Sequence, residues 1–529
     1  MIASEERVER NGGRGLRILF VLRSPELLRH YDETLEVLRS RGHQVVLAAS
    51  AKNRKKPLDL DHVRSGVEIA GILPLRNDEA GALARALRGS ANYLRFLDPR
   101  FEGTGALRAR MRDKHLHPSL RFFDRLRRLP SRPLRLFLRG LSAVERSLPT
   151  APALDALLRE REIDVVLVSP LVNGSSEQAE VLRSARARGL PTGACVASWD
   201  NLTNKGLLHG RPDRVFVWNE DQRREAIELH DIAPERVVVT GAQSFDKWFG
   251  RAPARDRAAF CERVGLGDGR PFVLFVGSSD FIARGRSEKE FVLRWLATLR
   301  RSDIVSLREV GVLVRPHPFQ IAEWADEDLS RFGSVAVWPR RVPHSLEEAD
   351  RADYFDSLFH AQAVVGINTS AMIEAAILGR PVHTVLDPAF AASQGGTLHF
   401  RYLPREHGGF VRSARTLEEH ALLLARDIDD PRPERDSATT AFVSRFVRPH
   451  GLDRPAAPIL AEGITELARI APARSRRDVL VRAAGRAFAV PLAAWMARAE
   501  GPTVRRSKSG NVKTSPEERR RLDESSGAV

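Results

Sequence analysis

The chain has 529 residues, of which 43% are hydrophobic and 29% are charged, and its formal net charge is +16. This composition excludes an intrinsically disordered chain, and the length predicts two domains with additional segments. The two cysteines, Cys195 and Cys261, are too few for a disulfide framework or a zinc site of four cysteines, whereas the positive charge predicts anionic partners.

The sequence also predicts a protein of the cytoplasm. No apolar run reaches the roughly 18 residues that a membrane span needs. Residues 1–15 are charged and lack the apolar core of a signal peptide. The low cysteine content fits a reducing compartment.

Residues 15–245 have the pattern of a Rossmann-like domain. An apolar strand is predicted over 15–22, a helix over 28–41 and a second strand over 44–49. The same rhythm resumes after residue 160, with strands predicted over 164–170, 192–197, 214–218 and 237–243.

A helical insertion over about 80–160 interrupts this domain. It is rich in Arg and Leu at helical spacing, which we interpret as packed helices with a solvated basic face. A helix lying on an anionic membrane surface is the alternative. The insertion has no signature of a nucleic-acid-binding module, so nucleic acid is not expected as a partner.

A polar loop follows the strand over 192–197, where residues 198–206 read SWDNLTNKG. Ligands of open α/β sheets bind beyond the carboxyl ends of the strands. A carboxylate at such an edge, Asp200, can take a proton, and an ammonium, Lys205, can bind an anion. The plainer interpretation is an Asx-rich turn capped by Asp200.

Residues 246–455 are predicted to form a second Rossmann-like domain. Its first strand, over 272–276, ends in Gly277 and Ser278, and such a turn of small residues lets a phosphate approach the backbone. A plain turn is the alternative interpretation.

The next strong strand of this domain lies in residues 311–318, which read GVLVRPHP. The two prolines fix the backbone where the strand stops and project Arg315 and His317 from its carboxyl end. Arg offers a planar fork for phosphate, and His can donate to phosphate or act as an acid near neutral pH.

A second signal lies in residues 363–382, which read AVVGINTSAMIEAAILGRPV. A buried strand runs into a helix that starts at Asn368, Thr369 and Ser370, and the free N–H groups of a helix start favour an anion. Glu374 lies one turn further and can accept a hydrogen bond from a ribose hydroxyl. A well-capped βα turn is the alternative, but with the RPHP strand end this segment predicts a pyrophosphate site.

These two motifs resemble the nucleotide-binding half of GT-B glycosyltransferases. The resemblance covers roughly residues 15–465 and is greatest to the bacterial surface-polysaccharide type, which includes capsular Kdo transferases and CDP-glycerol glycerophosphotransferase-like enzymes. It implies a GT-B fold, with two Rossmann-like domains whose parallel sheets face a central cleft. It also implies that a helix over 456–470 crosses back to the first domain. Residues 471–529 are predicted to form a basic amphipathic helix, over 476–498, and a disordered tail.

The resemblance also implies roles for the site residues. On the donor side it implies that His317 and the segment 368–370 hold the nucleotide phosphates and that Glu374 binds ribose. On the acceptor side, Asp200 would deprotonate a hydroxyl and Lys205 would meet the donor phosphates. Related glycerophosphotransferases have a histidine near this loop, so His209 is a second candidate base.

The sequence therefore predicts a glycosyltransferase that needs no metal or cofactor. Its substrates would be a nucleotide-sugar or a CMP- or CDP-linked donor and a carbohydrate or glycolipid acceptor, reached from the inner face of the plasma membrane. A UDP-sugar 2-epimerase of the same fold ranks second, because the loop at 197–201 holds one carboxylate and no glutamate. A basic membrane- or polyanion-binding protein without catalysis is the third candidate.

Overall fold

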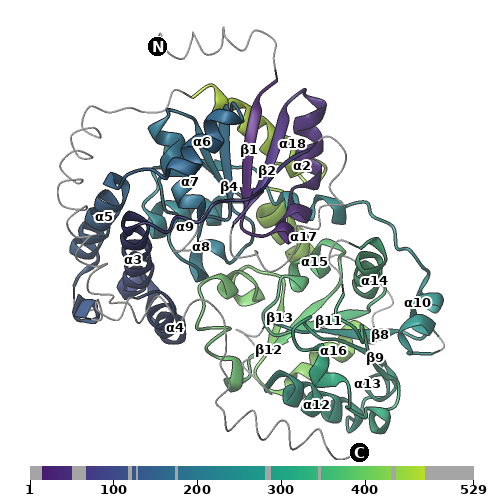
Figure 1. Cartoon of the computed structure of the whole chain (residues 1–529). Coiled ribbons are helices and arrows are strands. Elements are labelled where there is room, and N and C mark those ends of the chain that lie inside the picture. Colours follow the sequence, from purple (N-terminus) through teal and green to yellow (C-terminus); the bar gives the residue numbers. More distant parts are fainter. Residues whose placement is uncertain are drawn as a thin grey trace, which may run out of the picture.

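The computed structural model describes residues 15–50, 67–116, 122–126, 129–172, 177–267, 269–279, 287–343, 347–429 and 436–470. It consists of two α/β domains, each built on one parallel sheet, and a group of helices beside the first domain (Figure 1). The predicted fold class, two Rossmann-like domains with parallel sheets, is confirmed. The predicted basic helix and tail lie outside the described residues.

The first domain holds a seven-stranded sheet in the order β3-β2-β1-β4-β5-β6-β7. Its strands are runs of buried apolar residues, as expected for a parallel sheet covered on both faces. The strands are β1 (Arg17–Leu22), β2 (Gln44–Ala49), β3 (Glu68–Ile72), β4 (Val165–Ser169), β5 (Thr192–Cys195), β6 (Arg214–Val217) and β7 (Val237–Val239).

Helices cover both faces of this sheet. One face packs against α2 (Asp32–Ser40) and α18 (Ala456–Ala468), and α18 comes from the end of the described chain (Figure 1). The other face packs against α6 (Pro152–Glu160), α7 (Glu177–Ala187) and α9 (Glu220–His230).

The second domain holds a six-stranded sheet in the order β10-β9-β8-β11-β12-β13. Its strands are β8 (Phe272–Val276), β9 (Gly311–Arg315), β10 (Val335–Val337), β11 (Ala363–Gly366), β12 (Val382–Val385) and β13 (Arg412–Ala414). One face packs against α10 (Arg257–Val264), α14 (Glu348–Phe359), α15 (Ala371–Ile377) and α17 (Ser437–Phe442). The other face packs against α12 (Ser287–Arg300), α13 (Val305–Glu309) and α16 (Leu417–Asp429).

The predicted helix over 28–41 is divided in two. A 3₁₀ helix, η1 (Pro25–His30), and α2 meet at Tyr31, whose backbone angles of φ −128° and ψ 0° interrupt the helix. Tyr31 is only 1% exposed, and its hydroxyl lies 2.6 Å from the Ser169 hydroxyl. The break therefore places an aromatic ring in the core. Tertiary packing of this kind cannot be predicted from the helical periodicity of the sequence.

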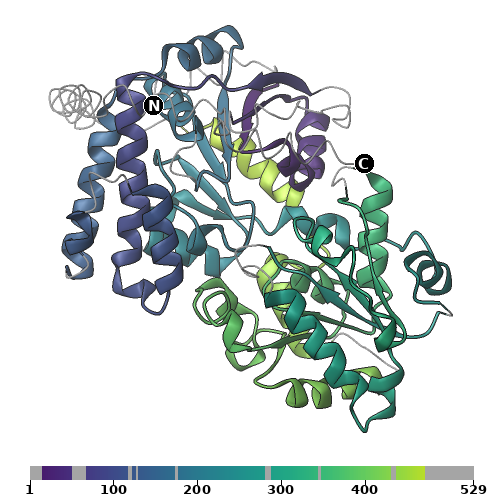
Figure 2. The same cartoon turned by 60° about the horizontal axis from the view of Figure 1, so that its bottom comes forward.

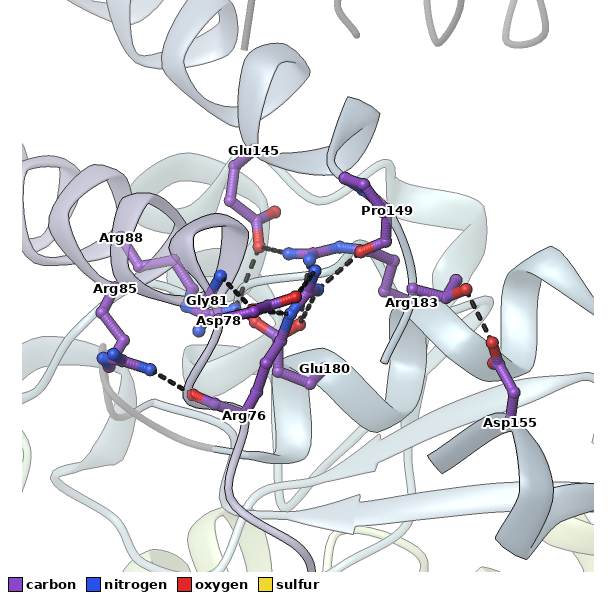
Figure 3. Close-up of polar contacts among 11 residues, drawn as sticks. Arg76, Asp78, Gly81, Arg85, Arg88, Glu145, Pro149, Asp155, Glu180 and Arg183 are labelled. Atoms are coloured by element: carbon purple, nitrogen blue, oxygen red, sulfur yellow. Dashed lines mark hydrogen bonds and ion pairs between the residues drawn. The ribbon is translucent and has the colours of Figure 1, made fainter. Parts of the chain in front are cut away.

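The helical insertion consists of α3 (Glu79–Leu94), α4 (Gly105–His115) and α5 (Ser131–Ser147), which stand beside the first domain (Figures 1 and 2). A buried charge network joins α3 and α5 to α7 (Figure 3). Arg88 of α3 is 2% exposed and contacts Glu145 of α5 at 3.0 Å and Glu180 of α7 at 2.7 Å. Arg183 and Arg76 also pair with Glu180, at 2.9 and 3.0 Å.

This network compensates each buried charge. Burial alone would raise the pKa of Glu180, but Arg88, Arg183 and Arg76 lower it to about 2. Glu180 therefore stays ionised, and the insertion is fixed to the sheet domain through charges that a sequence pattern assigns to the surface.

The two crossings between the domains meet at one carboxylate. Asp246, which follows β7, is 5% exposed and accepts hydrogen bonds from the N–H groups of Ala456 and Ala457 at 3.0 and 2.7 Å. It also pairs with Arg448 at 3.1 Å. The start of α18 is thereby capped by the segment that leaves the first domain, and both crossings are held side by side.

Replacing Glu180 by Gln should destabilise the first domain, because three buried guanidinium groups then share one fewer carboxylate. Losing one partner of a buried ion pair costs about 3–5 kcal/mol. Calorimetric melting should show a lower melting temperature than wild type at pH 7. Because the pKa of Glu180 lies below its ordinary value of 4.5, the difference should shrink as the pH falls from 4.5 towards about 2.

Glu36→Gln is the matched control. Glu36 pairs with Arg39 at 2.7 Å on α2 of the same domain, but the side chains are 37% and 49% exposed. Its loss should cost less than about 1 kcal/mol. Equal melting temperatures for the two variants would contradict the role given to the buried network.

Candidate functional site

A cavity of about 560 Å³ lies between the two domains. It is lined by the carboxyl ends of β8, β9 and β11 from the second domain and by the loops after β1 and β5 from the first domain. Such crevices at strand ends are the usual ligand sites of α/β proteins.

Most of the predicted donor-side residues meet in this cavity although they come from three separate strands. The predicted residues that line it are Gly277, Arg315, His317, Asn368, Thr369, Ser370 and Glu374. Ser278 does not line it. Ser278 is fully buried, and its backbone N–H donates to both carboxylate oxygens of Glu288, at 2.9 and 3.2 Å, instead of facing a ligand.

Gly277 permits the close approach of two strand ends. A Cβ atom at this position would lie 2.6 Å from the backbone nitrogen of His317 and 3.1 Å from Pro316. The Gly277 N–H donates to the Arg315 carbonyl at 2.8 Å. The glycine therefore fixes where His317 leaves the sheet.

His317 is half-buried on the cavity wall, and its orientation is set locally. The Phe319 N–H donates to Nδ1 of His317 at 3.4 Å, and the two rings lie 5.3 Å apart. Nδ1 is then the unprotonated nitrogen of the neutral ring, which leaves Nε2 as the hydrogen-bond donor.

Arg315 is a buried cation without an anionic partner among the described residues. It is 7% exposed, its guanidinium lies 4.9 Å from the centre of the Tyr354 ring, and Nη1 has no hydrogen-bond acceptor in the described structure. Burial lowers the pKa of Arg315 to about 10, which still leaves it charged at neutral pH. The charges of Asp353, Asp350 and Glu374 stabilise the guanidinium in part, but in the described structure none of these carboxylates forms an ion pair with it. A buried charge without a direct partner is costly, so this position favours an anionic ligand.

Glu374 lies near Arg315 on the same cavity wall. Its carboxylate accepts a short hydrogen bond from the Tyr354 hydroxyl. Burial raises the pKa of Glu374, and the Tyr354 hydrogen bond with the charges of Arg29, Lys247 and Arg315 opposes this shift. The carboxylate retains an acceptor capacity that a ligand hydroxyl can use.

On the first-domain side, Asp200 and Lys205 both line the cavity and form an ion pair of 3.1 Å. Asp200 precedes the short helix α8 (Asn201–Asn204), and its side chain does not cap that helix. Burial would raise the pKa of Asp200, but Lys205, His399 and a hydrogen bond from Ser198 lower it below its usual range. Asp200 is therefore ionised and is held in its ion pair with Lys205.

His209 does not line the cavity. It is 6% exposed, and Nε2 lies 2.8 Å from Oδ1 of Asn92 on α3 of the insertion. Burial and the charges of Arg88 and Arg95 lower the pKa of His209 well below its usual range. The structure thus gives this predicted base no access to the cavity.

The sequence analysis missed several residues of the cavity wall. Arg29 and His30 end the 3₁₀ helix η1, seven and eight residues after β1, so the strand-end pattern that identified Arg315 did not mark them. Lys247 lies on the first crossing, where its Nζ donates to the Arg29 carbonyl at 3.0 Å. His399 follows no strand, and no local pattern marked it.

Several buried polar atoms of cavity residues have no hydrogen-bond partner in the described structure and are available to a ligand. Besides Nη1 of Arg315, Oδ1 of Asn204 and the hydroxyl of Ser244 are buried without partners in the described structure, and both residues line the cavity. Among the described residues, no three His, Cys, Asp or Glu side chains are grouped to hold a metal ion, and no helix is long and apolar enough to span a bilayer.

No protein-family model matches the chain, and no curated protein does. Among solved structures, UDP-GlcNAc 2-epimerase from Neisseria meningitidis, bound to UDP-GlcNAc, is 13% identical with a TM-score of 0.48, over 85% of this chain and 100% of that chain. A glycosyltransferase from Rickettsia africae is 9% identical with a TM-score of 0.47, over 86% of this chain and 98% of that chain. The structure of MnaA from S. aureus with UDP is 12% identical with a TM-score of 0.47, over 86% of this chain and 98% of that chain.

These similar structures include a glycosyltransferase and a UDP-GlcNAc 2-epimerase. The narrower resemblance to capsular Kdo transferases and CDP-glycerol glycerophosphotransferase-like enzymes stays a prediction.

Replacing Arg315 by Met should raise the melting temperature of the ligand-free protein, because it removes a buried charge that no described carboxylate pairs with. Arg300→Met in the same domain is the contrast. Its guanidinium donates to the carbonyls of Phe332, Leu307 and Val310 at 2.7, 2.8 and 2.9 Å. Unmaking these bonds should cost about 1–3 kcal/mol.

Calorimetric melting of the ligand-free protein gives the melting temperatures of both variants and of the wild type. If Arg315→Met lowers the melting temperature as much as Arg300→Met, the Arg315 charge is compensated within the protein and does not await a ligand.

Proposed function

We propose that the cavity binds a nucleotide-activated sugar and that the protein transfers the sugar to an acceptor hydroxyl. The observation that carries this proposal is Arg315, a buried guanidinium that lines the cavity without a carboxylate partner among the described residues. Its planar fork can bind a phosphate through two parallel hydrogen bonds.

The rest of the second-domain wall fits the other parts of such a donor. His317, with Nε2 as its donor nitrogen, and the segment 368–370 supply hydrogen bonds to phosphate. Glu374 supplies an acceptor for the ribose hydroxyls. Arg29 and Lys247 add positive charge from the first domain and the crossing.

The first-domain wall supplies the acceptor side. Asp200 and Lys205 lie there as an ion pair, and Asp200 is proposed to support proton removal from the acceptor hydroxyl. The reaction is proposed to need no metal, so that EDTA should leave the rate unchanged. We place the acceptor among surface-polysaccharide or glycolipid precursors, reached from the cytoplasmic side.

Nucleotide binding tests this proposal directly. Titration calorimetry with UDP, CMP, CDP, GDP and TDP should find at least one that binds the wild type, and at one hundred times its dissociation constant it should add about 2.7 kcal/mol of stability. His317→Ala and Ser370→Ala should each weaken this binding tenfold or more, since each loses a contact worth about 1–3 kcal/mol. Gly277→Ala should do the same, because its Cβ atom displaces His317.

Two variants of the same domain control for general damage. His407→Ala changes an exposed histidine, and Gly395→Ala adds a methyl group where nothing lies within 4 Å. Both should bind like wild type. Unchanged affinity in His317→Ala, Ser370→Ala and Gly277→Ala would place the nucleotide elsewhere and remove the main support for the proposal.

A 2-epimerase remains the second candidate, and deuterium oxide separates the two. Epimerisation breaks and remakes the C2–H bond of the sugar, so solvent deuterium enters C2 without an acceptor. Sugar transfer leaves that hydrogen in place. If deuterium appears at C2 of the sugar nucleotide, the reaction is epimerisation and the proposed sugar transfer is wrong.

We further propose that the insertion contacts an anionic membrane surface, where a glycolipid acceptor lies. Phe122 and Leu136 are 57% and 65% exposed. The segments that carry them pack together, since the rings of Phe123 and Phe137 lie 5.5 Å apart. Arg125, Arg132 and Arg139 are exposed in the same two segments, and each Lys or Arg near an anionic leaflet contributes about 1 kcal/mol.

The double variant Phe122→Ser, Leu136→Ser should bind less tightly than wild type to vesicles containing anionic phosphatidylglycerol, in a sedimentation assay at low salt. Wild-type binding should weaken as salt rises and should be slight on neutral phosphatidylcholine. Val305→Ser, which changes a 53% exposed residue of the second domain, should bind normally. If the wild-type protein does not bind anionic vesicles at low salt, the basic face of the insertion is only a solvated surface and does not contact a membrane.

A further inference from the structure

His399 is the residue at which the two walls of the cavity meet. It belongs to the second domain, as the first residue of the 3₁₀ helix η11 (His399–Tyr402), and is 2% exposed. Its ring nevertheless contacts the first domain, where the Trp199 ring lies 4.7 Å away in an edge-on arrangement. His399 therefore borders the donor side and the acceptor side at once.

The hydrogen bonds around His399 fix which ring nitrogen is unprotonated. Nε2 lies 3.4 Å from the side-chain amide nitrogen of Asn368. Because this nitrogen can only donate a hydrogen bond, Nε2 is the acceptor. Nδ1 then carries the proton and faces the Thr203 hydroxyl at 3.4 Å. That hydroxyl donates onward to the Asp200 carbonyl at 3.3 Å.

Both contacts of the ring are long, so a substrate hydroxyl can replace Asn368 at Nε2. The Asn368 amide keeps a shorter bond to the Ser393 carbonyl, at 2.6 Å. The unprotonated nitrogen is thus directed at Asn368, beside the turn proposed to hold the donor phosphates.

The charges that face His399 among the described residues are those of Asp200 and Lys205 on the opposite wall. Burial lowers the pKa of His399 to about 4, and the Asp200 carboxylate opposes this shift. The ring is therefore neutral at pH 7, while Asp200 is held as an anion by its ion pair with Lys205. The neutral imidazole can take a proton, and the Asp200 charge favours the imidazolium that results.

We propose that Nε2 of His399 takes the proton of the acceptor hydroxyl in the transfer, with Asp200 as the group that stabilises the charged ring. The acceptor oxygen forms a bond to the anomeric carbon, and its proton passes to His399. The bond from that carbon to the donor phosphate breaks, and the nucleotide leaves with the electron pair. This inference rests on the proposed function and moves the proton-accepting role from Asp200 to His399.

The test compares His399→Gln and His399→Ala with wild type in a donor assay that uses water as the acceptor. UDP-glucose, GDP-mannose and dTDP-glucose serve as donors, and released nucleotide is measured. Both variants should lose about 10²–10⁴-fold in rate. Nucleotide affinity by calorimetry should stay within about threefold of wild type, because losing a proton acceptor lowers turnover and removes no contact to the donor.

Rescue distinguishes proton transfer from a structural role. Added imidazoles should restore turnover in His399→Ala, with rates that rise with the basicity of the imidazole, but not in His399→Gln, whose side chain fills the space. His407→Ala, an exposed histidine of the same domain, should keep the wild-type rate. If the rescued rate does not depend on the basicity of the added imidazole, His399 only fills space in the cavity wall, and the proposal is overturned.

Nitrogen NMR of ring-labelled histidines gives a second test that needs no turnover. The wild-type signal that is absent from the spectrum of His399→Gln belongs to His399. At pH 7 its chemical shift should be that of a ring with an unprotonated Nε2. A ring protonated at Nε2 would overturn the proposal whatever the rates. Wild-type turnover that persists in both variants refutes only the role of His399, whereas a wild type that binds none of the nucleotides refutes the proposed function.

Discussion

The relative placement of the two sheets depends on the buried carboxylate of Asp246. It accepts the first N–H groups of α18 and pairs with Arg448, so the segment that leaves the first domain and the segment that returns to it are fixed at one point. Beside it, the Ala242 N–H donates to the Val447 carbonyl at 2.9 Å. With both crossings held there, the carboxyl ends of the two parallel sheets face one cavity, and residues distant in sequence form its walls.

The sequence predicted most strands of the two sheets, but neither β3 nor β13, and most of the donor-side wall, because these follow from local pattern. Strands buried on both faces are continuous apolar runs, so β8, β9 and β11 were located within one or two residues. Polar residues just past such strands must lie at the carboxyl edge of a parallel sheet. Arg315 and His317 were therefore identified before their neighbours were known, and Glu374 was identified by its place one turn after the helix start at Ser370. All three line the cavity.

Contacts between segments distant in sequence could not be predicted in the same way. His209 was chosen because the resemblance to glycerophosphotransferases implies a histidine near this loop, but the chain turns it towards Asn92, away from the cavity. His399 reaches the cavity only because the domains are apposed. Arg88 resembles a surface residue of an amphipathic helix, and its burial depends on carboxylates of α5 and α7 that no periodicity reveals.

The central claim is that the second-domain strand ends hold a nucleotide. Hydrogen exchange of the full chain, with and without the tightest-binding nucleotide, tests it most directly, because it locates the ligand without any assumption about the reaction. The account predicts slower exchange for the amides of 277–279, 315–319 and 368–374. Protection confined to the first domain, or none at saturating nucleotide, would contradict it.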